Sequence, residues 1–123
     1  MNNTTWEING LTFELDLDDA LDMERYENAF KRLQEKAETL RKNADSASTK
    51  IKNTCTAYRN LIDDVFGDGT SAKIIPPDCW KLRNHEDMIA SFMAFIEAQA
   101  ATNKARVTAF TAKYKPVGRT STK

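Results

Sequence analysis

The sequence predicts a mainly α (α+β) protein in which an N-terminal β-hairpin precedes long antiparallel helices, packed as a coiled-coil-like helical hairpin. Two observations carry this prediction: an Asn-Gly turn between two alternating segments, and a heptad repeat that follows it. A chain of 123 residues is long enough for one hydrophobic core without disulfides or metal. We therefore expect a single domain over residues 1–114 and a disordered basic tail over residues 115–123.

The β-hairpin is predicted over residues 4–17. Asn9-Gly10 is the preferred two-residue type I′ turn, because both of its positions must adopt positive φ. With this turn Trp6 pairs with Phe13 and Ile8 with Leu11, so that the apolar side chains share one face. A lone hairpin is marginal in water, so this face must be a lid on the helices or a contact surface.

A helical region is predicted over residues 19–66, with Asp18 or Asp19 as its N-cap and Gly67 beyond its end. Apolar positions alternate spacings of three and four, which indicates a stripe packed along another helix. With Thr54 as the one exception, the stripe is apolar: Met23, Tyr26, Phe30, Leu33, Ala37, Leu40, Ala44, Ala47, Ile51, Thr54, Tyr58, Leu61 and Val65.

Whether this region is one helix or two depends on residues 43–48, the one stretch with poor helix formers. The heptad phase runs through it without a shift, and it contains neither Gly nor Pro. We favour a single helix on this ground, with two helices joined near residues 43–48 as the alternative. A single helix over residues 19–66 would be about 70 Å long, which argues for an elongated or oligomeric protein.

Residues 67–83 are predicted to form a loop, with Ile74 and Ile75 holding it to the core. A last helix is predicted over residues 84–112, with Asn84 as its N-cap and an acid three residues later. Its apolar face contacts the core, and Pro116 lies beyond its end. This face consists of Met88, Ile89, Phe92, Met93, Phe95 and Ile96, and Val107 and Phe110 extend it.

Composition excludes several classes of protein. The 29% of charged and 9% of aromatic residues are typical of neither a disordered nor a membrane protein. No apolar run approaches the roughly 20 residues that span a bilayer, and the N-terminus does not resemble a signal peptide. We expect a cytoplasmic protein, in which Cys55 and Cys79 stay free thiols that pack as small hydrophobic side chains.

The zero net charge conceals a gradient. Residues 1–40 carry ten acids and four bases, whereas no acid follows Glu97 and six bases do. The opposite charges of the two ends favour head-to-tail contact, within one chain or between copies. A solvated basic tail is the alternative. The basic end with its two aromatic residues is also a weak candidate for nucleic acid, which the acidic first third would repel. We expect no nucleic-acid partner.

No pattern of catalytic or metal-binding residues is evident, and we expect no enzyme, no cofactor and no metal. His85 is the only histidine and lies in a polar helix start, where a solvated residue is expected. A zinc site needs about four Cys or His ligands, and the chain has three such residues. The segment 67–71 lacks phosphate-loop spacing, and the segment 64–75 fails the EF-hand pattern. The acids near Asp16 have no calcium-loop context.

Four segments resemble a family of small phage and prophage proteins from Gram-positive bacteria. They are WEINGLTFELDLDDA, MERYENAFKRLQEKA, LIDDVFGDGTSAKI and AFIEAQ, and together they span residues 6–99. The chain departs from this family at residues 75–78, where Ile-Pro-Pro-Asp replaces a glycine-containing turn. The resemblance implies a role in virion tail assembly, as a tail assembly chaperone that coats a long helical tape-measure protein. It implies no catalytic residues.

The resulting hypothesis is a non-enzymatic protein that acts through protein–protein contacts, with itself and with a long helical tail protein. The alternatives are an oligomeric virion structural or scaffold component, and a phage-encoded regulator or inhibitor of a host protein or nucleic acid. A partner is expected on the large apolar side chains of the hairpin and the helices. These are Trp6, Ile8, Phe13, Tyr26, Phe30, Leu33, Tyr58, Phe92 and Phe95.

Overall fold

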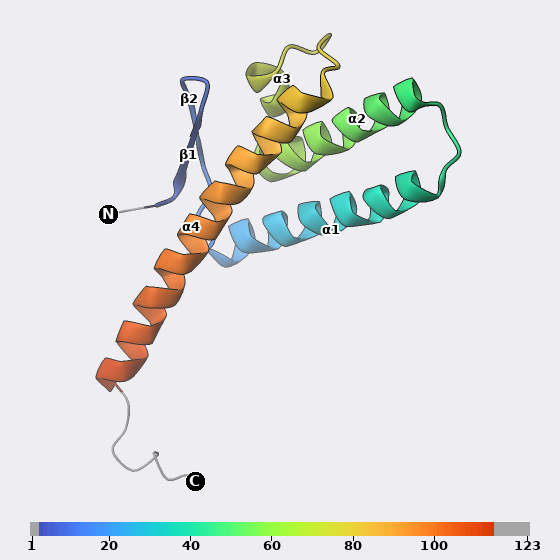
Figure 1. The fold of residues 1–123 in the computed structure, drawn as a ribbon. Helices are drawn as coiled ribbons and strands as arrows, with labels where there is room; N and C mark the ends of the chain where they lie inside the picture. The colour runs from blue at the N-terminus through green and yellow to red at the C-terminus, as the bar shows by residue number, and fades with distance from the viewer. Residues whose placement is uncertain (1–2, 115–123) are drawn as a thin grey trace.

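Over residues 3–114 the chain forms a β-hairpin followed by four helices, which confirms the predicted mainly α class. A computed structural model describes residues 3–114, so the predicted tail over 115–123 lies outside the described residues. The antiparallel pair α1 and α2 projects to one side of α4, and the β-hairpin lies on the other side (Figure 1). The elements are β1 (Thr5–Ile8), β2 (Leu11–Glu14), α1 (Ala20–Lys42), α2 (Ala47–Phe66), α3 (Thr70–Ile74) and α4 (Leu82–Tyr114).

The β-hairpin has the predicted turn and register. Asn9 and Gly10 adopt φ values of 52° and 78°, as a type I′ turn requires. Trp6 pairs with Phe13 and Ile8 with Leu11 across the two strands. The turn and the alternation of apolar residues specify the same strand register, and both are encoded within ten residues of sequence.

The hairpin is a lid on the helices. The Trp6 side chain is 2% exposed, and its Nε1–H donates to Ser91 Oγ of α4 at 3.0 Å. At the turn, Asn9 Nδ2 donates to the Ile74 carbonyl of α3 at 3.2 Å. The lid alternative is therefore correct for Trp6, because helix side chains cover the apolar face that an isolated hairpin would expose.

The helical region is two helices, so the prediction of one continuous helix was wrong. α1 ends at Lys42, and the next residue, Asn43, is extended (φ −80°, ψ 148°). Ser46 is the N-cap of α2, and its hydroxyl accepts from the Thr49 amide at 3.3 Å. Asn, Asp and Ser side chains compete for backbone hydrogen bonds and favour such caps over a helix interior.

The unbroken heptad phase misled because both helices use the stripe. α1 folds back on α2 (Figure 1), and stripe residues of both helices, Leu33 and Leu40 of α1 and Tyr58 of α2, line the space between them. The residues of the turn are few and happen to preserve the spacing. Because residues 19–66 form two helices and not one helix of about 70 Å, they give no reason to expect an elongated or oligomeric protein.

The core lies where the hairpin, α2 and α4 meet. Four aromatic rings form its centre, with the Trp6 ring centroid 5.3 Å from that of Phe92 and 5.6 Å from that of Phe66. Phe13 closes the group at 5.8 Å from Trp6. The other fully or nearly buried apolar side chains are Leu15, Leu17, Ala29, Leu61, Ile62, Val65, Ile74, Ile75, Met88, Phe95 and Ile96.

The predicted loop over residues 67–83 contains the short helix α3, which the sequence pattern did not indicate. Gly67 follows α2 at φ 115°, a conformation that glycine adopts most readily. Asp63 on α2 accepts from the Ser71 amide at 2.8 Å and so holds the start of α3. Ile74 and Ile75 are 7% and 5% exposed, which confirms that they hold this segment to the core.

α4 begins at Leu82, two residues before the predicted N-cap, and His85 is buried instead of solvated. Arg59 Nε of α2 donates to His85 Nε2 at 3.0 Å. The other ring nitrogen, Nδ1, lies 2.7 Å from the Lys81 carbonyl and can donate to it in this tautomer. The prediction failed because Arg59, 26 residues away in sequence, supplies the polar partner that makes burial of the histidine favourable.

Arg59 also joins α2 to the segment that precedes α4. Its guanidinium donates to three backbone carbonyls, at 2.7 to 3.2 Å, and each of them belongs to the segment that connects α3 with α4. These acceptors are the carbonyls of Ile75, Pro76 and Cys79. One side chain thus holds this connection and the buried histidine together.

The two ends of the charge gradient meet within the chain. Arg106 on α4 forms an ion pair with Asp18, just before α1, at 2.8 Å. Asp19 caps α1 and accepts from the amides of Leu21 and Asp22. Part of the acidic start of α1 is therefore satisfied by its own chain. Both side chains of the ion pair are more than half exposed, so we assign it little stability.

The two cysteines differ in exposure, and both are free thiols. Cys55 on α2 is fully buried, and burial raises the pKa of its thiol above the ordinary value. Cys79 is half-buried, and its sulfur accepts from Asn84 Nδ2 at 3.6 Å.

We expect an aromatic disulfide reagent to modify one thiol of the folded protein quickly and the other slowly. Cys79 is the fast one, because its side chain is only half-buried. Cys55 is slow, because it is inaccessible and because a raised pKa leaves less thiolate at a given pH. The variant Cys79→Ser isolates the slow reaction. Fast modification of Cys55 in that variant would contradict the placement of α2 in the core.

Candidate protein-interaction groove

The distal part of the α1–α2 pair extends away from the β-hairpin and from α4 (Figure 1). We call this part, residues 33–58, the arm. The heptad stripe is covered at the base of the pair, where Leu61 and Val65 are buried. Along the arm the stripe is only partly covered. Its exposed members are Ala37, Ala44, Ala47 and Ile51, the last 38% exposed.

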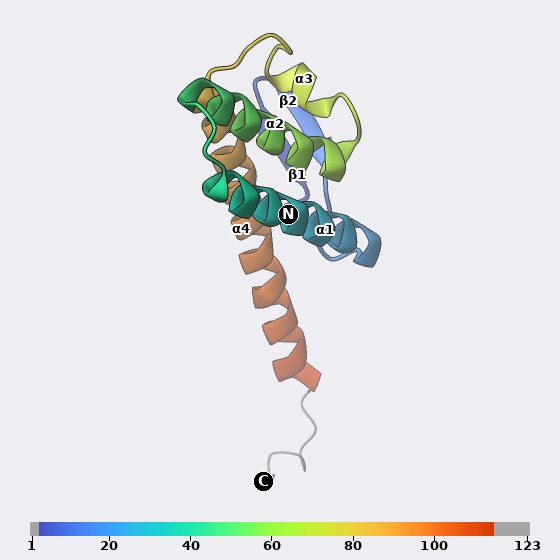
Figure 2. The same ribbon diagram turned by 90° about the vertical axis from the view of Figure 1, so that its right-hand side faces the viewer.

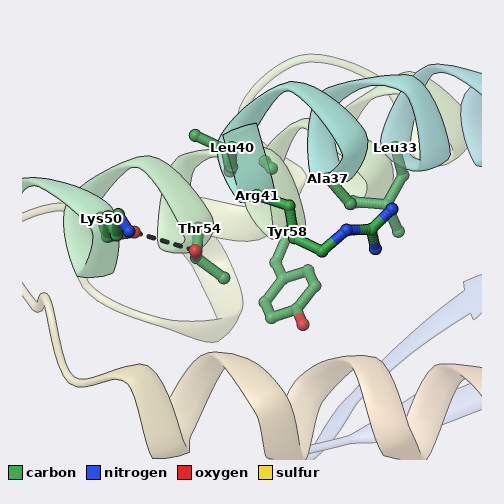
Figure 3. Close-up of a pocket in the computed structure, with 8 residues that line it drawn as sticks. Leu33, Ala37, Leu40, Arg41, Lys50, Thr54 and Tyr58 are labelled. Carbon is green, nitrogen blue, oxygen red and sulfur yellow. Dashed lines mark hydrogen bonds between the residues drawn. The ribbon is translucent and has the colours of Figure 1, made fainter. Parts of the chain in front are cut away.

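A groove of about 340 Å³ lies on the arm between α1 and α2. We call it the arm groove. Tyr58 of α2 and Arg41 of α1 lie on the same side of the pair, with Thr54 and Lys50 farther along α2 (Figure 3). The lining is Leu33, Ala37, Leu40 and Arg41 from α1, with Lys50, Thr54, Ala57 and Tyr58 from α2.

The floor of the arm groove is apolar and its rim is basic. Leu33 and Tyr58 are half-buried and pack against the hydrophobic core, so the floor continues the core outward. Arg41 and Lys50 are the charged residues of the lining, which includes no carboxylate. Arg41 pairs with Glu38 on its own helix. The groove thus combines a rigid apolar base with two cations from different helices.

A second depression, of about 410 Å³, borders the first, and Leu33 and Ala57 line both. Its charges are balanced, since Arg32 and Lys36 face Glu35 and Asp64. Arg32 Nε and Asp64 Oδ2 lie 3.0 Å apart and join α1 to α2. The second depression is therefore bridged by an ion pair of the chain itself, which sets it apart from the arm groove.

Two of the predicted contact residues, Leu33 and Tyr58, lie in the arm groove. Tyr26 and Phe30 are half-buried nearer the base of α1, with ring centroids 5.9 Å apart. Burial raises the pKa of the Tyr26 hydroxyl. On the hairpin, Phe13 packs against the core and Ile8 lines a separate shallow depression. The structure therefore does not bring the predicted set together into one surface.

Three of the predicted contact residues belong to the core instead. Trp6, Phe92 and Phe95 are 2%, 0% and 8% exposed, so no partner reaches them in this fold. The prediction was wrong for them because large aromatic side chains were chosen for size, and a small domain buries such residues first. The prediction missed Ala37 and Leu40, although both are in the heptad stripe. It also missed the basic rim, Arg41 and Lys50.

Both ring nitrogens of His85 are engaged by Arg59 and by the Lys81 carbonyl, and the ring is buried. Over residues 3–114, no three His, Cys, Asp or Glu side chains converge to hold a metal ion. In the same range, no helix has the length and apolar character to cross a membrane.

The fold and the groove define a small helical protein with an apolar, basic-rimmed groove on a projecting helical hairpin. The chain belongs to a family of unknown function, DUF6673, whose model matches residues 9–122. The match begins at the turn of the β-hairpin and includes the whole arm. No curated protein and no solved structure matches the chain.

Proposed function

We propose that this protein acts through protein–protein contacts without catalysis, and that a helical segment of a partner binds in the arm groove. The observation that carries the proposal is the part of the heptad stripe left uncovered along the arm. Helices commonly bind by placing an apolar face into a groove between two other helices. Such a groove lies here on the arm, between α1 and α2.

The setting that we propose is phage tail assembly in the host cytoplasm. The support for it is the sequence resemblance to small phage and prophage proteins. A tail assembly chaperone would hold a long helical tape-measure protein until the tail tube forms around it. A groove that admits one short stretch of helix suits weak contacts repeated along such a partner, because many copies can then bind at successive sites.

A second candidate function is an oligomeric scaffold component of the virion. The observation that favours it is the C-terminal half of α4, which extends beyond the rest of the fold (Figures 1 and 2). Val107 on this half is 51% exposed and Phe110 is 60% exposed. Concentration-dependent light scattering tests this candidate, which requires stable oligomers at micromolar concentration.

Co-expression with a long helical tape-measure protein of a phage tail tests the proposed function. We expect the wild-type protein to raise the soluble fraction of that partner. Ala37→Glu should abolish the effect, because it places a carboxylate on the apolar floor of the groove. Ala98→Glu, at an exposed position on α4, is the matched control and should retain it. A partner whose solubility does not respond to the wild-type protein would contradict the proposal.

A further inference from the structure

Resting on the proposed function, we infer that the ligand of the arm groove is an acidic amphipathic helix. Its apolar side chains enter the groove, and Asp or Glu residues beside them contact the basic rim. The inference concerns the chemical class of the partner segment. It follows from the length of the groove, from its charge, and from which neighbouring charged side chains already form ion pairs within the chain.

The length of the groove matches one turn or two of helix. Its lining on α1 runs from Leu33 to Arg41, which is about 12 Å at 1.5 Å per residue. Apolar side chains spaced i and i+4 on a partner helix lie about 6 Å apart along its axis. Two such anchors therefore fit along the floor. Thr54 is one of the few polar uncharged groups in the lining, so the floor favours apolar anchors over polar ones.

The charge of the arm indicates which residues lie beside the apolar anchors of the ligand. The arm, residues 33–58, includes five Lys and Arg against three acids. Lys50 forms no ion pair within residues 3–114, and Arg41 pairs with an acid on its own helix, not across the groove. A helix with carboxylates beside its anchors would complete ion pairs with both cations. Because complementary charge steers binding and rejects wrong partners, a basic helix is disfavoured.

The same reasoning weighs against the chain's own segments as occupants. The α4 half that extends from the fold is basic, through Lys104, Arg106 and Lys113, so the rim would repel it. The start of α1 is acidic, but three of its aspartates are engaged. Asp18 pairs with Arg106, Asp19 caps α1, and Asp22 pairs with Arg25. A second copy is therefore a poorer ligand than a separate acidic helix.

Two synthetic peptides test the inference directly. Both form helices with leucines at i and i+4; one carries Glu beside the leucines and the other carries Lys at the same positions. Fluorescence anisotropy with the full chain should show the Glu peptide binding at least about tenfold more tightly at low salt. The difference should shrink as salt is raised, because screening weakens exposed ion pairs.

Charge reversal at the rim supplies the matched comparison. The double variant Arg41→Glu/Lys50→Glu should weaken binding of the Glu peptide by at least about tenfold and improve binding of the Lys peptide. Lys31→Glu/Lys73→Glu makes the same change of charge at exposed positions outside the lining, and should retain the preference. Circular dichroism of both variants verifies that their helices are intact.

The other outcomes would overturn the inference in distinguishable ways. Equal binding of both peptides, lost in Ala37→Glu, would retain the groove and remove the acidic ligand. If neither peptide binds but the partner's solubility is still raised in co-expression, the arm groove does not bind an acidic helix. The proposed chaperone role would then remain. Self-association that disappears in Arg41→Glu/Lys50→Glu would assign the groove to a second copy.

Discussion

Replacing Trp6 by alanine is expected to lower the free energy of unfolding by about 3–5 kcal/mol, the range typical of aromatic truncation in a core. The Trp6 ring contacts Phe13, Phe66 and Phe92, with centroids 5.3 to 5.8 Å away. It also donates a hydrogen bond to Ser91. Alanine would leave a cavity among these rings and remove the attachment of the hairpin to α4. Urea denaturation followed by circular dichroism measures the loss.

Trp80 provides the control, since it is the only other tryptophan and is 42% exposed. Trp80→Ala should change the free energy of unfolding by well under about 1 kcal/mol, as is usual for surface substitutions. Equal effects of the two substitutions would contradict the placement of the hairpin as a lid. A small effect of Trp6→Ala alone would indicate that the hairpin is loosely attached and that its apolar face is available.

Gln99→Ala should destabilise the fold by an amount comparable to a large core truncation. Its side chain is 1% exposed and serves two backbone groups of the segment that links the hairpin to α1. Gln99 Oε1 accepts from the Leu17 amide at 2.5 Å, and Gln99 Nε2 donates to the Leu15 carbonyl at 2.9 Å. Alanine leaves both groups buried without partners, at a cost of about 1–3 kcal/mol each.

Gln34 is the only other glutamine and is exposed on α1, so Gln34→Ala is the matched control. It should leave the urea midpoint nearly unchanged. Gln99→Glu offers a second comparison, because it keeps the acceptor for Leu17 but loses the donor to Leu15 and buries a charge. If Gln99→Ala and the wild-type protein have the same urea midpoint, solvent must hydrogen-bond the Leu17 amide and the Leu15 carbonyl. That result would contradict the burial of Gln99.

The parts of the fold that the sequence predicted well are those encoded locally. The β-hairpin followed from Asn9-Gly10 and ten residues of alternation, and the start of α1 from its aspartates. Contacts between distant segments were not predictable in this way. The burial of His85 depends on Arg59, and the packing of α1 against α2 brings together residues that are far apart in the sequence. A heptad stripe specifies a helical partner but not which helix provides it.

The candidate site was predictable in kind but not in place. The sequence analysis predicted a partner on large apolar side chains of the hairpin and the helices, and two of these residues, Leu33 and Tyr58, lie in the arm groove. Which part of the heptad stripe stays uncovered depends on where the β-hairpin and α4 pack, and this is a property of the whole fold. Trp6 and Phe92 illustrate the limit, because their size predicts burial and contact equally well.

Amide hydrogen–deuterium exchange, with and without the bound partner, tests the central claim most directly. It reports which backbone segments a partner stabilises. If the partner helix binds in the arm groove, exchange should slow within residues 33–58 and stay unchanged in β1, β2 and the end of α4. Slower exchange in the β-hairpin or in residues 100–114, with the arm unaffected, would contradict the claim and place the partner on another surface.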